Sequence, residues 1–426
     1  MLTAGDTIAL DIERPVAGGR MLARHGGQIV LVSGAIPGER VAARVERVAR
    51  SVAHAETVDV LEASPDRRPS EDWRCGGREY AHVAYERQLA LKADVIADAF
   101  RRIGRLPLAT PPPVLASPEA GYRMRARFHA ANGRLGFFRE GSHALCDATV
   151  TGQLADGAVA WLAAAQQKLT PQLASAIIAV ELAENLPGRE RAVHVEVRGS
   201  VDRRALMPLA DGLTGLSAHG QSPAVEVLAG SPLVTDSLST SAGGGLPALI
   251  LSRHVRAFFQ ANRFLLEPLV HHVVNLLPPG PVADLYAGVG LFGLAAASTG
   301  HEPVTLVEGV PTSGANLESN ARAFGGRVRL LRRSVEAALA SGLGPVVTCL
   351  VDPPRTGLSD AARAGVARLG ARRIVYVSCD VATLARDSRA LVDAGYELAQ
   401  LTGVDLFPAT AHIETVAVFD RDHPGR

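Results

Sequence analysis

Residues 284–292, DLYAGVGLF, decide the fold of this chain. They end an apolar run that predicts a strand, and they lead into the apolar segment of a predicted helix. The next predicted strand ends at Glu308. A glycine turn between a strand and a helix, with an acidic residue at the end of the next strand, is typical of nucleotide-like ligand sites in open α/β sheets.

The residues of this turn suggest what the ligand is. Gly288 and Gly290 let a ligand approach the backbone, and Glu308 can bind both hydroxyl groups of a ribose. We take the dinucleotide fingerprint to be broken after Gly290, and we therefore expect a ligand without a pyrophosphate. S-adenosylmethionine fits that description.

Strands and helices alternate regularly from about residue 251 onwards. The predicted strands cover residues 281–286, 304–308, 328–331, 346–351, 374–378, 397–404 and 415–419. This alternation predicts a mostly parallel, doubly wound α/β sheet. The last two strands are joined by a segment too short for a helical crossover, so we expect them to be antiparallel.

The chain has 426 residues, which suggests two or three domains. Residues 1–62 contain short alternating strands separated by glycine turns, which predicts a small β-barrel. Residues 63–250 are predicted to form a central α/β domain, with a helix over 85–103, and residues 251–426 form the doubly wound domain. In the central part, Arg123, Arg125 and Arg127 alternate and share one strand face, which is either solvated or faces RNA.

Composition excludes several classes of protein. The formal net charge is +1, which argues against a general coating of polyanions but leaves a local basic surface open. The longest apolar stretch, near residues 285–297, is shorter than the ~18 residues of a membrane helix. Four cysteines and no signal peptide favour a reducing cytoplasm over a disulfide scaffold. We expect a cytoplasmic monomer.

Two side chains follow apolar runs in the C-terminal part and could carry chemistry. Cys379 follows the predicted strand 374–378, and Glu414 lies in the segment 407–416. A thiol at the carboxyl end of a strand can act as a nucleophile, and a nearby carboxylate can take a proton. The alternatives are an inert buried thiol and a surface carboxylate. Asp352 begins the sequence DPPR at another strand end, which is otherwise an ordinary turn.

These motifs together resemble the RNA (uracil-5-)methyltransferase family. The resemblance is carried by FQAN at 259–262, the glycine turn at 284–290, DPPR at 352–355, SCD at 378–380 and HIE at 412–414. It implies a Rossmann-like class I methyltransferase sheet over 251–426, preceded by an RNA-binding TRAM-like barrel of the OB type. The matching positions imply that Cys379 is the nucleophile and Glu414 the general base. The implied contacts to S-adenosylmethionine or uracil are Gln260, Tyr286, Gly288, Gly290, Glu308 and Asp352.

The resemblance implies methylation of carbon 5 of a uridine in structured rRNA or tRNA. In that chemistry a thiolate adds to carbon 6, carbon 5 takes the methyl group, and a base then removes the carbon-5 proton. Two alternatives stay open. One is a methyltransferase acting on an exocyclic amine of a base, which needs no cysteine, and the other is an RNA-binding protein of this fold that has lost turnover.

The chain departs from the family pattern where some members bind an iron-sulfur cluster. Cys75 and Cys146 match two of the four cluster ligands, but Pro69 and Arg78 stand at the other two positions. We therefore expect no cluster and no metal. We expect Cys75 and Cys146 to lie close together as free thiols, and Arg78 to turn toward solvent or RNA.

Two further departures concern the methyltransferase domain. Leu291 replaces a residue that is often Asn, which removes one possible cofactor contact. Val381 replaces a Pro that often follows the Ser-Cys-Asp motif, so we expect a freer loop after Cys379.

Overall fold

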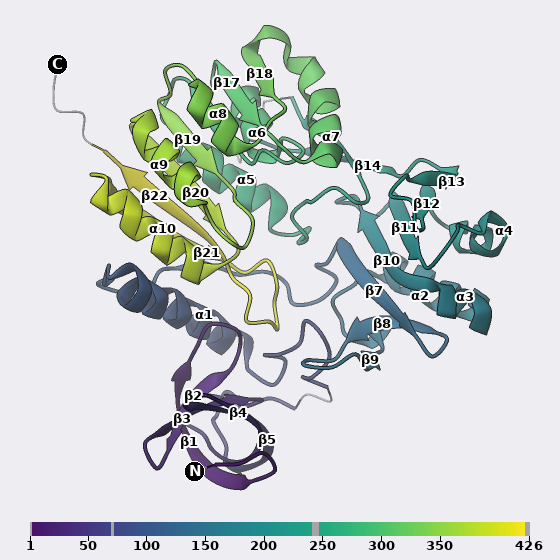
Figure 1. Ribbon diagram of the computed structural model, residues 1–426, viewed down its shortest axis with the longest axis vertical. Coiled ribbons are helices and arrows are strands. Elements are labelled where there is room, and N and C mark those ends of the chain that lie inside the picture. Colours follow the sequence, from purple (N-terminus) through teal and green to yellow (C-terminus); the bar gives the residue numbers. More distant parts are fainter. Residues whose placement is uncertain (1, 70–71, 241–246, 422–426) are drawn as a thin grey trace.

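The computed structural model describes residues 2–69, 72–240 and 247–421. It has a closed barrel, a seven-stranded sheet and an eight-stranded sheet, with a two-stranded hairpin between the two sheets. Figure 1 shows the barrel at one end of the molecule, the eight-stranded sheet with its helices at the other, and the seven-stranded sheet to one side. The predicted fold class, a small β-barrel with α/β parts, is confirmed.

The N-terminal barrel closes in the order β1-β2-β3-β5-β4. Its strands are β1 (Thr7–Pro15), β2 (Met21–His25), β3 (Gln28–Ser33), β4 (Arg40–Ala49) and β5 (Val52–Glu62). Side chains alternate along each strand, so that Val41, Ala43 and Val45 fill the interior while Arg40 and Arg44 face out. Closure leaves no free sheet edge.

The segment after the barrel packs on the eight-stranded sheet. Helix α1 (Tyr85–Ala99) continues as a π-helical turn to Gly104, which confirms the predicted helix. Its apolar face, including Ile96 and Ala99, joins one hydrophobic core of that sheet. Strand β6 (Val114–Leu115) then pairs in parallel with β21 at the sheet edge. Residues 85–115 therefore belong physically to the C-terminal sheet.

The seven-stranded sheet has the order β13-β12-β11-β10-β7-β8-β9. Its strands are β7 (Arg125–Ala131), β8 (Arg134–Phe138), β9 (Leu145–Cys146), β10 (Ile177–Glu184), β11 (Arg191–Val197), β12 (Gly215–His219) and β13 (Glu226–Gly230). Helices α2 (Asp156–Lys168) and α3 (Pro171–Ala176) cover one face, where Phe128, Leu182 and Val193 are buried. The hairpin of β14 (Leu233–Leu238) and β15 (Leu249–His254) follows.

Arg123, which precedes β7, and Arg125 and Arg127 of β7 are not simply solvated. Arg127 is exposed and pairs with Glu181 at 2.7 Å and Glu196 at 2.8 Å. Arg125 lies 5.9 Å from the ring centre of Phe258, and Arg123 donates to Gln153 at 2.7 Å. Each guanidinium therefore has a partner in the protein, and Arg127 is the exposed one of the three.

The eight-stranded sheet has the order β18-β17-β16-β19-β20-β22-β21-β6. Its other strands are β16 (Val282–Leu285), β17 (Val304–Val307), β18 (Val328–Leu331), β19 (Thr348–Val351), β20 (Arg373–Ser378), β21 (Glu397–Val404) and β22 (Glu414–Asp420). All seven predicted strands are confirmed, with small shifts at their ends. The predicted antiparallel pairing of the last two is also confirmed, and β22 is antiparallel to β20 as well.

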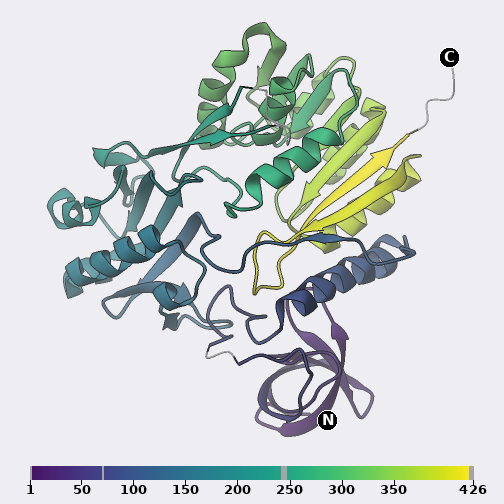
Figure 2. The ribbon, with the colours of Figure 1, turned by 180° about the vertical axis from the view of Figure 1, so that it is seen from behind.

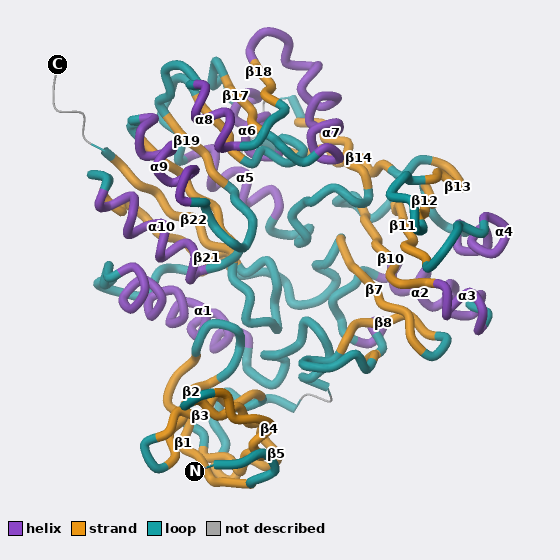
Figure 3. Tube along the Cα trace, in the orientation of Figure 1, coloured by secondary structure: helices purple, strands orange, loops and turns teal. Residues whose placement is uncertain are grey.

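Helices cover both faces of this sheet, as the tube in Figure 3 and the rear view in Figure 2 show. The helices are α5 (Leu266–Asn275), α6 (Leu291–Ser298), α7 (Pro311–Ala321), α8 (Val335–Ser341), α9 (Asp360–Leu369) and α10 (Val381–Asp393). One core contains residues of α5, α6 and α7, and the other contains residues of α1, α8, α9 and α10. Neighbouring strand residues alternate between the two cores, and Cys349 is a fully buried member of the second.

From β16 the chain adds β17 and β18 on one side of the sheet, and it then adds β19 and β20 on the other side. The direction in which strands are added therefore reverses between the neighbours β16 and β19. Ligands of open α/β sheets bind outside the carboxyl ends of the strands at such a reversal. Because β22 is antiparallel to β20, its first residue lies at this same edge. The topology thus brings several predicted site residues to one edge.

Cys75 and Cys146 come together as predicted, but the prediction of two free thiols is wrong. They form a disulfide, with 5.6 Å between the Cα atoms. Main-chain contacts bring them together, because Gly76 donates its N–H to the carbonyl of Phe138 at 3.0 Å and Phe137 pairs with Cys146. Arg78 is half-buried, and its guanidinium donates to the carbonyl of Thr151 at 2.7 Å, so that its turn toward solvent or RNA stays a prediction.

The described residues contain no group of three or more His, Cys, Asp or Glu side chains placed to hold a metal ion. None of the helices in the described ranges is long and apolar enough to cross a bilayer.

Candidate active site

Cys379 and Glu414 lie at the ends of two neighbouring strands. In the antiparallel register of β20 and β22, Ser378 is opposite Thr415; Cys379 directly follows Ser378, and Glu414 directly precedes Thr415. The two side chains are close enough for the charge of Glu414 to act on the thiol. Glu414 is buried, whereas Cys379 is half-buried and free. A thiol and a carboxylate therefore meet at the carboxyl edge of the sheet.

The turn that carries Cys379 is held by hydrogen bonds. Asp380 caps helix α10, because its Oδ1 accepts from the N–H of Thr383 at 2.8 Å. Ser378 donates its hydroxyl to the carbonyl of Asp380 at 3.0 Å. Val381 is the first, buried residue of α10, so the expectation of a freer loop after Cys379 is wrong.

The DPPR segment reaches the same edge from β19. Asp352 follows this strand, and its N–H donates to the carbonyl of Leu285 at 3.3 Å. The loop beyond it is anchored by Asp387 of α10, which is fully buried and accepts from the N–H of Leu358 and from the hydroxyl of Tyr376, both at 2.8 Å. Sequence reasoning missed Asp387, although an acidic residue on the apolar face of a predicted helix signals a buried anchor.

Charge couples these groups. Burial raises the pKa of Glu414 to about 8, against the lowering effect of Arg355. Burial and the charge of Glu414 raise the pKa of Asp352 well above its usual range. Burial raises the pKa of Cys379 to about 11, with Glu414 as the next cause and Arg355 opposing it. Arg355 is thus the cation of the site, and its role was not assigned from the sequence.

The glycine turn after β16 leaves room for a ligand. Gly288 has a φ of +58°, and a Cβ atom added to it would meet nothing within 4 Å. Tyr286 also adopts a left-handed backbone, with a φ of +65°. Glu308 lies beside the turn and accepts from the N–H of Gly288 at 2.8 Å and from the N–H of Val310 at 2.5 Å. An open backbone beside a buried carboxylate fits the ribose end of S-adenosylmethionine.

The other glycines of this turn serve packing. A Cβ atom on Gly290 would lie 2.5 Å from Leu294. Gly293 stands at the third position of the dinucleotide spacing, so the prediction of a broken fingerprint is wrong. A Cβ there would lie 2.2 Å from Leu306, which means that this glycine lets α6 approach β17. The spacing alone therefore does not choose between a dinucleotide and S-adenosylmethionine.

Gln260 comes from a different part of the chain. It is buried in the connection between β15 and α5. The ring of its neighbour Phe259 lies 4.3 Å from the guanidinium of Arg253, and the carbonyl of Ala261 accepts from the N–H of Met124 at 2.8 Å. The other predicted cofactor contacts come after strands of the eight-stranded sheet. Tyr286, Gly288 and Gly290 lie between β16 and α6, Glu308 follows β17, and Asp352 follows β19.

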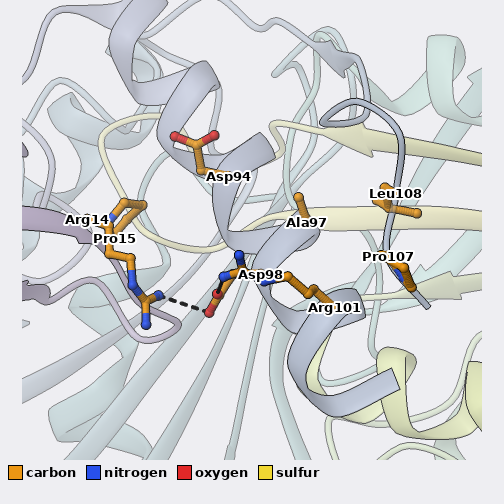
Figure 4. A pocket seen from close by; sticks show the side chains of 8 residues that line it. All are labelled: Arg14, Pro15, Asp94, Ala97, Asp98, Arg101, Pro107 and Leu108. Atoms are coloured by element: carbon orange, nitrogen blue, oxygen red, sulfur yellow. Dashed lines mark hydrogen bonds and ion pairs between the residues drawn. The ribbon is translucent and has the colours of Figure 1, made fainter. Parts of the chain in front are cut away.

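A separate hollow of about 300 Å³ lies between the barrel and α1. Figure 4 shows its lining, in which Arg14 of the barrel reaches Asp98 of α1 at 3.1 Å. The lining residues are Arg14, Pro15, Asp94, Ala97, Asp98, Arg101, Pro107 and Leu108. None of them is a predicted site residue, so this hollow belongs to the interface between the barrel and α1.

Comparison with known proteins places these features in a family. The model of the tRNA (uracil-5-)-methyltransferase family matches residues 326–422, and the model of the TRAM domain matches residues 2–58. A 23S rRNA (uracil(1939)-C(5))-methyltransferase of Methylococcus capsulatus is 33% identical over 98% of this chain and 97% of its own length. The protein of the same name from Pseudomonas putida is 34% identical over 96% of this chain and 93% of its own.

A solved structure shares the fold of nearly the whole chain. The tRNA (uracil-54, C5)-methyltransferase of Pyrococcus abyssi, in complex with S-adenosyl-L-homocysteine, superposes with a TM-score of 0.74. The match covers 96% of this chain and 100% of that protein, at 22% sequence identity. The arrangement of barrel, central sheet and doubly wound sheet is therefore that of a known methyltransferase fold.

Proposed function

Because this chain belongs to the RNA (uracil-5-)methyltransferase family, we propose that it methylates carbon 5 of a uridine in 23S rRNA through a covalent adduct with Cys379. Relatives that match nearly the full length carry the rRNA activity in their names. The model matching the C-terminal part is named for tRNA, which makes tRNA the second candidate. The observation that carries the proposal is that Cys379 and Glu414 lie at the ends of neighbouring strands at the ligand-binding edge, where the charge of Glu414 acts on the thiol.

Cys379 supplies the nucleophile that uracil needs. Carbon 5 of uracil is a poor nucleophile until the Cys379 thiolate adds to carbon 6, forming an S–C6 bond and moving an electron pair toward carbon 5 and the O4 carbonyl. Burial and the charges of Glu414 and Asp352 hold the pKa of this thiol high, at about 11. Arg355 counters that rise, and we assign it the role of favouring the thiolate.

Glu414 is the general base. Once carbon 5 carries the methyl group, its proton must leave, and the Glu414 carboxylate on the strand beside Cys379 takes it. The C5–C6 double bond then re-forms, the S–C6 bond breaks, and Cys379 leaves as thiolate. A pKa of about 8 makes this carboxylate a stronger base than an exposed glutamate, while part of it remains ionised near neutral pH.

S-adenosylmethionine supplies the methyl group when bound. Glu308 would hold its ribose, Gly288 would let it approach the backbone, and Asp352 would bring it near Cys379. Gln260 and Tyr286 complete the proposed contacts, and Gly290 shapes the turn. The open space at Gly288 and the position of Glu308 beside it support this assignment.

The target uridine must leave its stack to reach Cys379, which suits a loop or bulge of structured RNA. We propose that the barrel, residues 1–62, binds that RNA, that residues 63–250 form a central domain apart from residues 85–115, which pack on the C-terminal sheet, and that residues 251–426 carry the chemistry. A monomer in the cytoplasm is part of the same proposal, and sedimentation of the purified protein tests the monomer.

Trapping on modified RNA tests the mechanism. RNA with 5-fluorouridine at the target cannot lose a proton from carbon 5, so it should stay attached to the wild-type protein after methyl transfer. Cys379→Ala should abolish the adduct, and Glu414→Gln should accumulate it on natural RNA. An adduct that survives Cys379→Ala would refute the assignment of the nucleophile.

Separate assays with 23S rRNA fragments and tRNA, read by mass spectrometry of nucleosides, identify the substrate. Methylation of tRNA alone would overturn the choice of rRNA. Methyl transfer that persists in Cys379→Ala would instead favour the amine methyltransferase. RNA binding without any transfer would favour the protein that has lost turnover.

A further inference from the structure

The loop 405–413 delivers Glu414 to the site. It joins β21 to β22, and its two ends are adjacent because Val404 pairs with Glu414. Asp405, its first residue, is fully buried and donates its N–H to the carbonyl of Leu115 at 2.9 Å. The position of Glu414 therefore depends on how this loop is held.

Lys92 of α1 holds the start of the loop. Its Nζ lies 2.5 Å from Oδ1 of Asp405 and donates to the carbonyl of Phe407 at 3.0 Å. Both charged groups are almost fully buried, and Oδ2 of Asp405 accepts from the hydroxyl of Tyr85 at 3.0 Å. A buried ion pair is weak evidence for stability, because apolar replacements of both partners often fold as well or better. Its geometric effect is the better explanation for this pair.

Gln88, one helical turn before Lys92, holds the middle of the loop. Its Oε1 accepts from the N–H of Ala409 at 2.8 Å, and the carbonyl of Ala409 accepts from the N–H of Tyr80 at 2.7 Å. Ala409 has a φ of +61°, in the left-handed region that an alanine avoids. Gln88 is fully buried, and its Nε2 donates to the carbonyls of Tyr80 and Val83. The strained residue is thus held on both sides.

A third contact ties the loop to the segment of Gln260. Asn262 donates its Nδ2 to the carbonyl of Leu406 at 3.1 Å and to the hydroxyl of Ser117 at 2.8 Å. Asn262 is itself fully buried. The loop is therefore bound to α1 and, outside this helix, to the segments of Tyr80, Leu115 and Asn262.

We propose that Lys92 and Gln88 are positioning residues, which hold the loop 405–413 in the conformation that sets Glu414 against Cys379. This inference rests on the proposed function, because Glu414 acts there as the base. It assigns α1 a part in the proton-removal step, although no residue of α1 is among the proposed contacts to substrate or cofactor.

The double substitution Lys92→Met with Asp405→Leu tests the ion pair. Removing both charges avoids an unpaired buried charge. We expect a folded protein that forms the covalent adduct on 5-fluorouridine RNA as the wild type does. Tritium release from uridine labelled at carbon 5 should slow by roughly 100-fold, as expected for a catalytic group displaced by about 1 Å. On natural RNA the variant should accumulate the adduct.

The matched control removes an ion pair at the far end of the same two strands. Arg373 of β20 and Asp420 of β22 are opposite each other and pair at 2.7 Å. Arg373→Met with Asp420→Leu should leave tritium release unchanged. Wild-type tritium release in Lys92→Met with Asp405→Leu would overturn the proposal, and so would an equal loss in the control.

Rescue tests the role of Gln88. Gln88→Leu should slow tritium release, because Ala409 loses the acceptor that fixes its left-handed backbone. Adding Ala409→Gly should restore part of the rate, since glycine adopts a positive φ without strain. Gln88→Leu with a normal rate, or no recovery with Ala409→Gly, would contradict this role.

Hydrogen exchange separates this inference from the proposed function. The amide of Ala409 should lose protection in Gln88→Leu and in the Lys92 and Asp405 double variant, but not in the control. This measurement needs no RNA. If the wild type formed no adduct, the proposed function would fail. Hydrogen exchange would still show whether Lys92 and Gln88 hold the loop. Unchanged protection would overturn the positioning role.

Discussion

At the scale of single residues, the pKa of Cys379 depends on the charges of Glu414 and Arg355. The carboxylate of Glu414 raises the pKa of the thiol, and the guanidinium of Arg355 lowers it. Replacing the carboxylate by an amide removes a negative charge, so Glu414→Gln should bring the thiol pKa below its value of about 11. Arg355→Met removes a positive charge and should raise it. Each shift should be on the order of one pH unit, or ~1.4 kcal/mol.

The rate of alkylation by iodoacetamide as a function of pH measures this thiol, because only the thiolate reacts. Cys349 is buried and Cys75 and Cys146 are bonded to each other, so Cys379 is the accessible free cysteine among the four. Cys379→Ala supplies the background. Shifts of the same sign in both variants would contradict the charge assignment.

At the scale of elements, the strands of the C-terminal sheet could be predicted because each is a short apolar run between turns or helices. The edge strand β6 could not, since it consists of Val114 and Leu115 after a run of prolines. Cys379, Glu414 and Asp352 could be proposed from their places at strand ends. Lys92 and Asp405 could not be paired, because 313 residues separate them and an isolated Lys in a predicted helix suggests a solvated face.

The disulfide is another element that could not be predicted, and it makes a testable contribution. It closes a loop of 71 residues and ties the segment before α1, which also contacts Ala409 through Tyr80, to strand β9. Cross-links of this kind stabilise by about 2–4 kcal/mol, chiefly by restricting the unfolded chain. Reduction should therefore lower the urea midpoint of the wild type. The double variant Cys75→Ser with Cys146→Ser should have this lower urea midpoint both with and without reductant. If reductant left the urea midpoint of the wild type unchanged, the disulfide would not contribute to stability.

At the scale of the whole molecule, the barrel touches the loop that carries Glu414. A turn of the barrel contains Gly18 and Gly19, both with positive φ, and a Cβ atom on Gly19 would lie 3.0 Å from the Cβ of Ala411. The barrel also contacts α1 through Arg14 and Asp98, on the helix that supplies Lys92 and Gln88. Figures 1 and 2 both show the barrel against α1. Through these contacts, an RNA bound to the barrel would affect the conformation of the loop 405–413.

The two glycines of this turn allow a matched test of that effect. Gly19 has a φ of +88° and Gly18 a φ of +90°, but a Cβ on Gly18 would meet nothing within 4 Å. Valine at either position should strain the backbone equally, by about 1–2 kcal/mol, because both need a left-handed conformation. Only Gly19→Val should also push Ala411. We expect Gly19→Val to slow single-turnover tritium release about tenfold more than Gly18→Val, at similar melting temperatures. Equal rates in the two variants would show that the barrel contact does not reach Glu414.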